Sequence, residues 1–303
     1  MTEPSRYTTP AAFRRALTDR LRPLTLDGTW TLSQLQRQTA FDRLLTRLYQ
    51  SNSEWVIKGA TALLARHIGV RGTLDIDLLL NRARTEAEAE LRAAAATDIG
   101  DWFRFEISLA RPVAAGTPGV RLPVKAYIGA TVWSSFHVDL FGSDLKMTGT
   151  PDRVEPLVRI EMEGVSQGEY RVYPIVDHVA DKVVATFQRY GDRQVPSTRY
   201  KDLVDLVAIS SAASIDAAAL RTALESEAQR REVVLPVCFD VPDRVLWSSG
   251  YAKAAREAKV TDGPTLDDAL ALVTSFVDPV LDGTARGRWM PAARTWTAGG
   301  EGS

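Results

Sequence analysis

The stretch that decides the fold is Arg71-Gly72-Thr73-Leu74-Asp75-Ile76-Asp77-Leu78-Leu79-Leu80. Its aliphatic residues predict a strand over 73–80, and residues two apart on a strand point to the same face. Asp75 and Asp77 are therefore expected side by side, while their aliphatic neighbours project from the opposite face. Two like charges this close repel each other unless a cation lies between them. The pattern favours a divalent-metal site, although acidic residues at a strand end are also often simply solvated.

The segment before this strand, Lys58-Gly59-Ala60-Thr61, lies between a predicted strand at 55–57 and a predicted helix at 60–68. Backbone N–H groups in the turn, the positive end of the helix and the Thr61 hydroxyl are the kinds of group that hold a triphosphate. A Gly-x-Thr sequence alone is a weak signal. The order of strand, turn, helix and D-x-D strand makes a nucleoside triphosphate the expected ligand.

A third carboxylate is expected on a later strand. The alternation in Phe136-His137-Val138-Asp139-Leu140-Phe141 predicts a strand over 133–141 in which Val138 and Leu140 are buried on one face. Asp139 then projects from the other face and is a candidate third metal ligand. It is equally well explained as a charge at the end of its strand, beside a turn.

The composition is that of an ordinary globular protein. The chain has 303 residues, a formal net charge of -1 and 45% hydrophobic residues, so a uniformly basic protein is excluded while a local basic patch is not. Cys238 is the sole cysteine, which excludes an intramolecular disulfide. No apolar run is long enough to span a membrane and no Cys/His cluster indicates zinc. We expect a cytoplasmic protein with no membrane association.

The order of the remaining elements predicts an α+β fold. A mixed sheet with flanking helices is expected first and a mainly helical part second. This gives a domain at 1–170, a helical domain at 171–285 and a flexible tail at 286–303. The predicted helices of the first part are 10–22, 32–50 and 84–96, and its further strands are 102–110, 122–130 and 156–163. The later helices are 175–190, 198–211, 214–231, 250–259 and 265–281; the segment 232–247 gives no prediction.

These residues resemble the DNA polymerase β-like nucleotidyltransferase superfamily. More closely, the chain resembles the AbiEii/AbiGii-type nucleotidyltransferase toxins of type IV toxin–antitoxin pairs. Members carry a K-G-G-S/T-x-L turn and then R-x-S-x-D-x-D, which correspond here to residues 58–63 and 71–77. They also have a lysine on a later helix, here Lys182, and a D-L-x-D-L segment, here 202–206. The four motifs occur in the same order, which is more specific than any one of them.

The resemblance implies a bilobed fold and transfer of a nucleotide from an NTP with Mg²⁺, or with Mn²⁺ in its place. Some members modify the 3′ end of tRNA and block translation, so tRNA and a cognate antitoxin are the implied partners. The implied metal ligands are Asp75, Asp77 and Asp139. The implied nucleotide-binding residues are Lys58, Gly59, Thr61, Arg66, Thr73 and Asp202, and the implied catalytic residues are Asp75, Asp77, Lys182 and Asp205.

The residues of the second half also have plain structural explanations. Lys182 would be an ordinary lysine on a solvated helix face, and Asp202 and Asp205 would pair with Arg199 or Lys201. Two roles are open for Asp205, orienting Lys182 or acting as a base, and the division of roles between Asp202 and Asp205 stays open. Arg66 would be an exposed helix arginine.

Two departures from the family pattern lie in the first half. Ala60 replaces the second glycine of the turn, so this position cannot rely on a positive φ. Thr73 replaces the usual serine, which keeps the hydroxyl and adds a methyl group.

An RNA acceptor requires a basic surface. Arg37, Arg43, Arg47, Arg189, Arg193 and Arg199 are candidates, together with Arg286, Arg288 and Arg294 near Trp289 and Trp296. Each of these residues is explained equally well as part of a solvated surface. Two alternative functions remain at this level. In the first, the chain is a nucleotidyltransferase whose acceptor is a protein hydroxyl or a small molecule. In the second, the chain is not an enzyme and binds a nucleotide or a partner without turnover.

Overall fold

The computed structural model describes residues 7–26, 28–69, 73–113 and 119–297. The chain divides into two compact units, a sheet unit (Met1–Ala65, Gly72–Lys146 and Asp152–Val172) and a helical unit (Arg66–Arg71, Met147–Pro151 and Tyr173–Ser303). The last crossing between them follows Val172. Arg71 and Gly72, which begin the D-x-D motif, lie outside the described residues.

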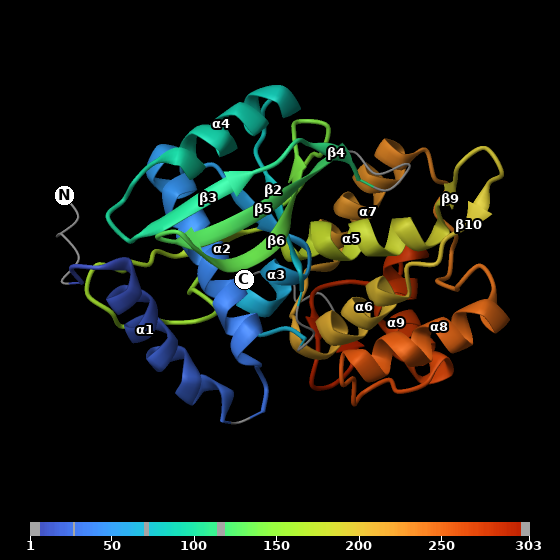
Figure 1. Cartoon of the computed structure of the whole chain (residues 1–303). Helices are drawn as coiled ribbons and strands as arrows, with labels where there is room; N and C mark the ends of the chain where they lie inside the picture. Colours follow the sequence, from blue (N-terminus) through green and yellow to red (C-terminus); the bar gives the residue numbers. More distant parts are fainter. Residues whose placement is uncertain (1–6, 27, 70–72, 114–118, 298–303) are drawn as a thin grey trace, which may run out of the picture. The chain divides into compact units, whose positions relative to one another are not determined.

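The sheet unit holds a mixed sheet whose strand order is β3-β5-β6-β2-β1-β8-β7, with β4 paired to β5 (Figure 1). Its strands are β1 Val56–Lys58, β2 Asp75–Leu79, β3 Phe103–Ile107, β4 Arg111–Pro112, β5 Val120–Ile128, β6 Thr131–Phe141, β7 Asp152–Val154 and β8 Tyr170–Val172. Its helices are α1 Pro10–Leu21, the short 3₁₀ helix η1 Arg22–Thr25, α2 Leu32–Ser51, α3 Gly59–Ala65 and α4 Arg84–Ala96. Strand β2 is central, antiparallel to β1 and parallel to β6.

The helices of this unit begin where their sequences provide caps. Thr31 and Gln34 form a capping box at the start of α2, in which each side chain accepts a hydrogen bond from the other residue's backbone N–H. Helix α1 begins with Pro10 after the N-cap Thr9, whose hydroxyl accepts from the Ala12 N–H. Helix α4 has the bounds that its Ala- and Glu-rich sequence predicts.

One face of the sheet forms the core of the unit. Ile76 and Leu78 of β2 and Val138 and Leu140 of β6 are each 0% exposed. They belong to a single apolar cluster with residues of α2 and α4, and both of these helices contact β6. Full burial of each side chain contributes about 1.5–3 kcal/mol. Because side chains alternate along a strand, this burial fixes the aspartates of β2 and β6 on the opposite face.

The helical unit contains five helices among the residues that the structure describes, together with two short hairpins. These elements are α5 Ile175–Phe187, α6 Tyr200–Ala212, α7 Ala217–Arg231, α8 Arg244–Glu257, α9 Leu266–Leu281, and the strand pairs β9 Arg189–Tyr190 with β10 Val195–Pro196 and β11 Trp289–Met290 with β12 Thr295–Trp296. Two buried indoles bond backbone carbonyls of this unit: Trp247 donates to the Ser197 carbonyl (2.9 Å), just before α6, and Trp289 to that of Ser210 (2.7 Å), within α6. The prediction of a mixed sheet followed by helices, an α+β fold, is confirmed.

The prediction of a strand over 156–163 is wrong. Val158, Ile160 and Met162 are buried at alternate positions, which is the pattern that suggested a strand. For the first two, however, the backbone partner is a side chain: Gln167 accepts from the Ile160 N–H (2.7 Å) and donates to the Val158 carbonyl (2.8 Å). The Met162 carbonyl accepts from the nearby Val165 N–H (3.0 Å). Strands of this sheet that the sequence did not reveal include β7 and β8; β8 pairs antiparallel with β7 and parallel with β1.

The end of the chain also differs from the expectation of a flexible tail over 286–303. Trp289 is 1% exposed, and its ring lies 5.0 Å from that of Phe276 and 5.6 Å from that of Trp296. Aromatic burial therefore holds the hairpin β11–β12 against α9. Residues 298–303 lie outside the described part of the chain. In the described part, no helix has the length and apolar character needed to cross a membrane.

Candidate active site

A row of charged side chains crosses the polar face of the sheet. Strand pairing places Lys58 of β1 opposite Asp77 of β2, Asp77 opposite Asp139 of β6, and Asp139 opposite Arg121 of β5. Residues opposite each other on neighbouring strands project from the same face. Asp75 lies on this face two residues before Asp77. We call Lys58, Asp75, Asp77, Arg121 and Asp139 the carboxylate face. The structure thus brings together the three predicted carboxylates.

The turn at Gly59 requires glycine for two reasons. Its φ of +60° is a conformation that residues with a Cβ rarely adopt. A Cβ built on Gly59 would also lie 1.9 Å from Asp77 Oδ2, well inside van der Waals contact. The missing side chain is therefore the space that the Asp77 carboxylate occupies. The positive φ falls on Gly59 and not on Ala60, so the alanine in place of the family's second glycine is tolerated within α3.

Asp75 is held from its backbone and from its carboxylate. The Thr73 hydroxyl accepts from the Asp75 N–H (3.2 Å) and donates to the Asp75 carbonyl (2.9 Å), and Thr61 donates to the same carbonyl (3.4 Å). His137 Nδ1 lies 3.0 Å from Asp75 Oδ1. The hydroxyls of Thr61 and Thr73, two residues predicted for nucleotide binding, therefore fix the start of the aspartate strand. Thr61 is 1% exposed.

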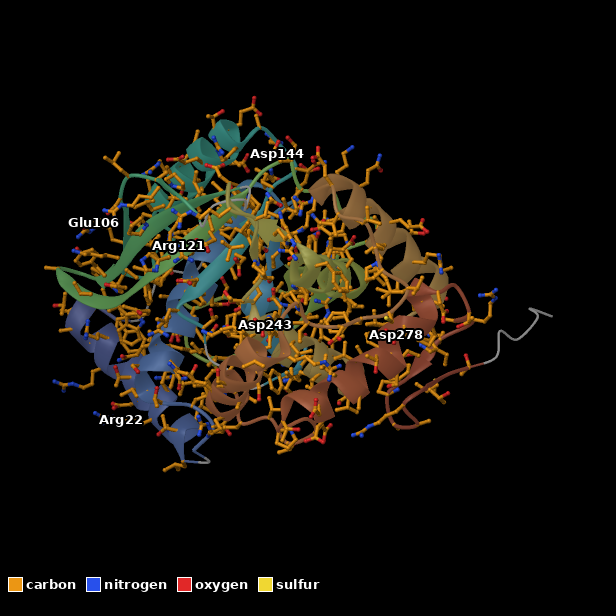
Figure 2. All side chains as sticks on the ribbon, turned by 90° about the vertical axis from the view of Figure 1, so that its right-hand side faces the viewer. Arg22, Glu106, Arg121, Asp144, Asp243 and Asp278 are labelled. Atoms are coloured by element: carbon orange, nitrogen blue, oxygen red, sulfur yellow. The ribbon has the colours of Figure 1, made fainter. Side chains whose placement is uncertain are left out.

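Arg121 is the member of this face that the sequence did not reveal. Its Nε donates to Asp139 Oδ1 and its Nη2 to Asp139 Oδ2, both at 2.7 Å, and Nη2 also lies 3.2 Å from Asp75 Oδ2. Figure 2 shows it on the strands of the sheet. The bonds to Asp139 and the charges of Asp75 and Asp77 raise the pKa of Arg121 further above its ordinary value. In the sequence, the one sign that Arg121 faces the aspartates is its place next to Leu122, which is buried on the other face. Its pairing with Asp139 depends on the register of β5 on β6.

Lys58 is 5% exposed, and its Nζ lies 5.2 Å from the centre of the Phe141 ring. Its apolar stem is buried while its charge lies beside the carboxylates. Arg37 of α2 lies on the same side of the unit and donates to the Thr73 carbonyl (3.1 Å). Burial lowers the pKa of Arg37, an effect that the charge of Asp75 opposes. Together these contacts surround the D-x-D strand with cationic groups.

The predicted residues of the second half form a separate cluster within the helical unit. Lys182 Nζ of α5 lies 2.7 Å from Asp205 Oδ2 and 3.3 Å from Asp202 Oδ1 of α6, and all three side chains are buried. Asp202 also pairs with Arg199. This contradicts the explanation of Lys182 as a solvated helix lysine. Arg66 follows α3 directly and is half-buried, so it is not the exposed helix arginine of the alternative explanation.

The donor set of the carboxylate face suits a hard divalent cation. Mg²⁺ in proteins is commonly held by one or two carboxylates together with substrate phosphates, and Asp75 and Asp77 supply two carboxylates on one face. Within the described ranges, no group of three or more His, Cys, Asp or Glu side chains is placed to hold a metal ion. The third predicted ligand, Asp139, has both of its oxygens bonded to Arg121.

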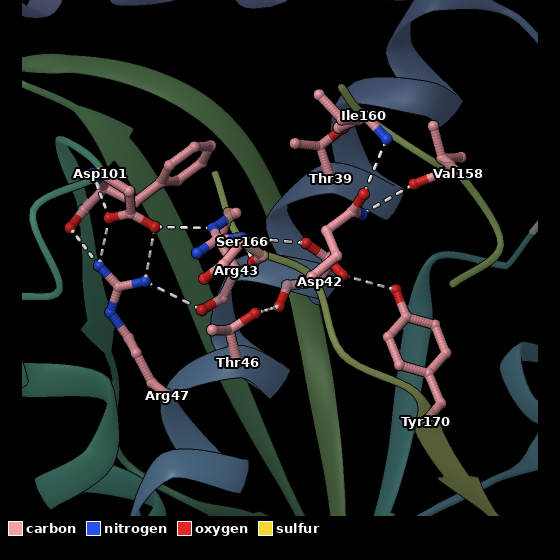
Figure 3. Close-up of polar contacts among 12 residues, drawn as sticks. Thr39, Asp42, Arg43, Thr46, Arg47, Asp101, Val158, Ile160, Ser166 and Tyr170 are labelled. Carbon is pink, nitrogen blue, oxygen red and sulfur yellow. Dashed lines mark hydrogen bonds and ion pairs between the residues drawn. The ribbon is translucent and has the colours of Figure 1, made fainter. Parts of the chain in front are cut away.

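Two arginines predicted for an RNA surface are instead structural. Arg43 and Arg47 of α2 are each 1% exposed and converge on Asp101, which is fully buried (Figure 3). Arg43 Nε lies 2.7 Å and Arg47 Nη2 2.6 Å from the Asp101 carboxylate. The prediction was wrong because α2 is covered on several sides, so that its polar residues are buried as well. We call Arg43, Arg47 and Asp101 the buried arginine cluster.

The other arginines proposed for RNA divide by exposure. Arg199 is paired with Asp202, and the indole of Trp289 is buried, so neither is part of an open basic surface. Arg189, Arg193, Arg286, Arg288 and Arg294 are exposed. These five residues are the candidates that remain.

Comparison with known proteins places the chain in a family. The model of the nucleotidyl transferase AbiEii toxin family, type IV toxin–antitoxin system, matches residues 43–289, a span that includes both the carboxylate face and the Lys182 cluster. No curated protein sequence matches the chain. Similar solved structures include MenT4, a nucleotidyltransferase toxin from Mycobacterium tuberculosis H37Rv (15% identity, 93% of this chain and 100% of that chain, TM-score 0.49). Another is JHP933 from Helicobacter pylori (14% identity, 82% of this chain and 94% of that chain, TM-score 0.44).

The family model alone carries the assignment, because both TM-scores lie below 0.5. Its match extends over most of the chain. The protein is therefore a nucleotidyltransferase of the AbiEii toxin family.

Proposed function

We propose that this toxin transfers a nucleoside monophosphate from an NTP to an RNA acceptor, the 3′ end of tRNA, with Mg²⁺ or Mn²⁺, and so blocks translation. An acceptor hydroxyl forms the new bond to the α-phosphorus, the bond from the α-phosphorus to the β-phosphate breaks, and pyrophosphate leaves. The observation that carries the proposal is the carboxylate face. Asp75, Asp77 and Asp139 project together from two adjacent strands, beside a glycine turn that leaves room for one of the carboxylates. Such a face is suited to the charges of a metal-bound triphosphate.

In this proposal Asp75 and Asp77 hold the divalent ion. When bound, the ion would neutralise charge on the triphosphate and increase the acidity of the attacking hydroxyl. Lys58 adds a positive charge beside Asp77, with which it is paired in register. Gly59 keeps the space for the Asp77 carboxylate, while Thr61 and Thr73 act by fixing the backbone of Asp75. Arg66 remains a candidate for phosphate binding by resemblance.

Lys182 and Asp205 belong to the proposal through the family resemblance. The lysine would offset negative charge that develops on the phosphates during transfer. The 2.7 Å contact to Asp205 supports an orienting role for this carboxylate rather than that of a base, since it bonds the lysine directly. Asp202 makes the longer contact, at 3.3 Å, and shares its carboxylate with Arg199. Asp202 is therefore a supporting residue in this proposal.

The acceptor is the least constrained part of the proposal. RNA binding would use exposed arginines such as Arg189, Arg193 and Arg286, because the buried arginine cluster is closed to solvent. The choice of tRNA rests on the resemblance to members that modify its 3′ end. A cognate antitoxin and a cytoplasmic location follow from the type IV toxin–antitoxin family in the same way.

The test identifies the acceptor directly. The full chain is incubated with total cellular RNA and each of the four NTPs in turn, with Mg²⁺ or Mn²⁺, and the RNA 3′ ends are sequenced. We expect added nucleotides on tRNA 3′ ends. In the same reaction with labelled NTP, label found only on protein or on a small molecule would support nucleotidyl transfer and contradict RNA as the acceptor. Ends that stay unmodified on every RNA would contradict an RNA acceptor.

A further inference from the structure

Arg121 lies where a cation among the carboxylates is expected. Its guanidinium bonds both oxygens of Asp139 at 2.7 Å and reaches Asp75 Oδ2 at 3.2 Å. The bidentate geometry is the strongest that an arginine and a carboxylate form. The Asp139 side chain is 7% exposed, against 30% for Asp75 and 39% for Arg121. Asp139 is thus the best covered of the three, and both of its oxygens are already in use.

The cation on this face is permanent. An arginine stays protonated throughout the accessible pH range, so it cannot give way to a metal by losing its charge. A divalent ion that approached Asp139 would meet a fixed positive charge within a few ångströms, in a half-buried place where charges are poorly screened. The guanidinium and the ion therefore cannot both take the in-plane oxygens of the same carboxylate. One of them has to move.

We propose that Arg121 is the resident counter-cation of the carboxylate face and competes with divalent metal for Asp139 and Asp75. Arg121 bonds both oxygens of Asp139 and reaches one oxygen of Asp75, whose other oxygen lies 3.0 Å from His137 Nδ1, so a metal ion at Asp139 or at Oδ2 of Asp75 has to displace the guanidinium. A metal position that includes Asp139 becomes available only after the guanidinium has left. This inference rests on the proposed function, in which the face holds metal.

The proposal explains two features of the fold. Three aspartates on adjacent strands repel each other, and an internal guanidinium lets the sheet form without metal. It also explains why the described residues contain three carboxylates on one face but no group of three placed to hold an ion. Arg121 is in this sense a positioning residue, acting through Asp139.

The test measures binding of Mn²⁺ to the full-length protein without nucleotide, by electron paramagnetic resonance of the free ion. Arg121→Gln removes the charge and keeps a polar amide group near the position of the arginine Nε. We expect Mn²⁺ to bind at least about tenfold more tightly, since the competing cation is gone. Arg121→Lys keeps the charge but cannot form the bidentate bond, and is expected to bind about threefold more tightly.

Asp139→Asn supplies the matched comparison. In the wild-type background it is expected to change Mn²⁺ affinity little, because Asp139 is already occupied by Arg121. In the Arg121→Gln background it should remove the gain. Thermal melts establish that each variant is folded. If Arg121→Gln does not fold, the comparison is made with Arg121→Lys.

Unchanged or weaker Mn²⁺ binding in the folded Arg121 variants would overturn the inference. So would a gain that persists after Asp139→Asn. Because no nucleotide is present, tighter binding without any nucleotidyl transfer would uphold the competition and count against the proposed function alone. Nucleotidyl transfer by the wild type, together with unchanged Mn²⁺ affinity in the Arg121 variants, would overturn the competition and support the proposed function.

Discussion

The sheet unit contains two clusters built from the same two residue types in opposite arrangements. In the buried arginine cluster, two guanidiniums converge on Asp101, which also accepts the Phe103 N–H at 3.1 Å, and Arg43 Nη1 lies 3.3 Å from a second buried carboxylate, Asp42. On the carboxylate face, one guanidinium serves the carboxylates of Asp139 and Asp75. The first cluster is closed to solvent, whereas Arg121 is 39% exposed.

The difference shows what residue type alone does not. A carboxylate that is enclosed by cations and backbone donors needs no further ligand. The arginines around Asp101 also donate to backbone carbonyls; Arg43 Nη1, for example, donates to the Ser166 carbonyl at 2.6 Å. The three carboxylates of the other cluster share Arg121 and the register-paired Lys58, so negative charge is in excess there, and the 30% exposure of Asp75 gives a further cation access. We therefore interpret the first cluster as structural and the second as functional.

The largest expected effect on stability comes from Asp101→Asn. It leaves the buried Arg47 without the Asp101 carboxylate and Arg43 with only its 3.3 Å contact to Asp42, and breaking such a buried pair costs about 3–5 kcal/mol. Urea denaturation measures the loss, and transfer activity per folded molecule should be retained. Glu106→Gln is the control, since the exposed pair of Glu106 with Arg104 should contribute nothing measurable. Equal losses of stability in Asp101→Asn and Glu106→Gln would contradict the interpretation of the buried arginine cluster as structural.

The same cluster predicts a pH dependence. Burial would raise the pKa of Asp101, but hydrogen bonds from Arg47 and the charge of Arg43 lower it overall from 3.8. A carboxyl whose folded-state pKa is lowered contributes stability above its unfolded pKa and loses it as the pH falls through the folded value. The stability gap between wild type and Asp101→Asn should therefore narrow below pH 3.8. A gap that stays constant into acid would contradict this.

A smaller effect on stability, with a large one on activity, is expected for Gly59→Ala. A residue with a Cβ at positive φ costs about 1–3 kcal/mol. The new Cβ would also collide with Asp77 Oδ2 and displace the carboxylate, so transfer should fall further than stability. Gly28→Ala is the matched control: Gly28 has φ +73°, and a Cβ there meets no described atom within 4 Å. Equal losses of transfer activity in Gly59→Ala and Gly28→Ala would contradict the role of Gly59 in keeping space for the Asp77 carboxylate.

The smallest predicted difference separates Asp205 from Asp202. Asp205 makes the shorter bond to Lys182, while Asp202 is shared with Arg199. Asp205→Asn should lower the turnover rate about tenfold more than Asp202→Asn, the size of one charge-assisted hydrogen bond. Steady-state kinetics on the folded variants measures both. Losses of stability without a difference in turnover would make this cluster structural, like that around Asp101.

The sequence predicted features that depend on local pattern. Helix α4 has its predicted bounds because its propensity is strong throughout, and Asp75, Asp77 and Asp139 were placed on one face by strand alternation. Features that depend on distant partners were missed. Gln167 replaces a strand partner for residues 158–160, and the bond of Arg121 to Asp139 requires the register of β5 on β6. Arg43 and Arg47 looked exposed because their partner, Asp101, is distant in sequence.

The most direct test of the central claim is transfer of label from an α-labelled NTP to total tRNA, measured with the wild type and with Asp77→Asn. The variant keeps the size of the side chain next to Gly59 and removes its charge. We predict incorporation by the wild type and a loss of at least about a hundredfold in the variant, without loss of folding. Equal incorporation by both proteins, or none by the wild type from any of the four NTPs, would contradict the account.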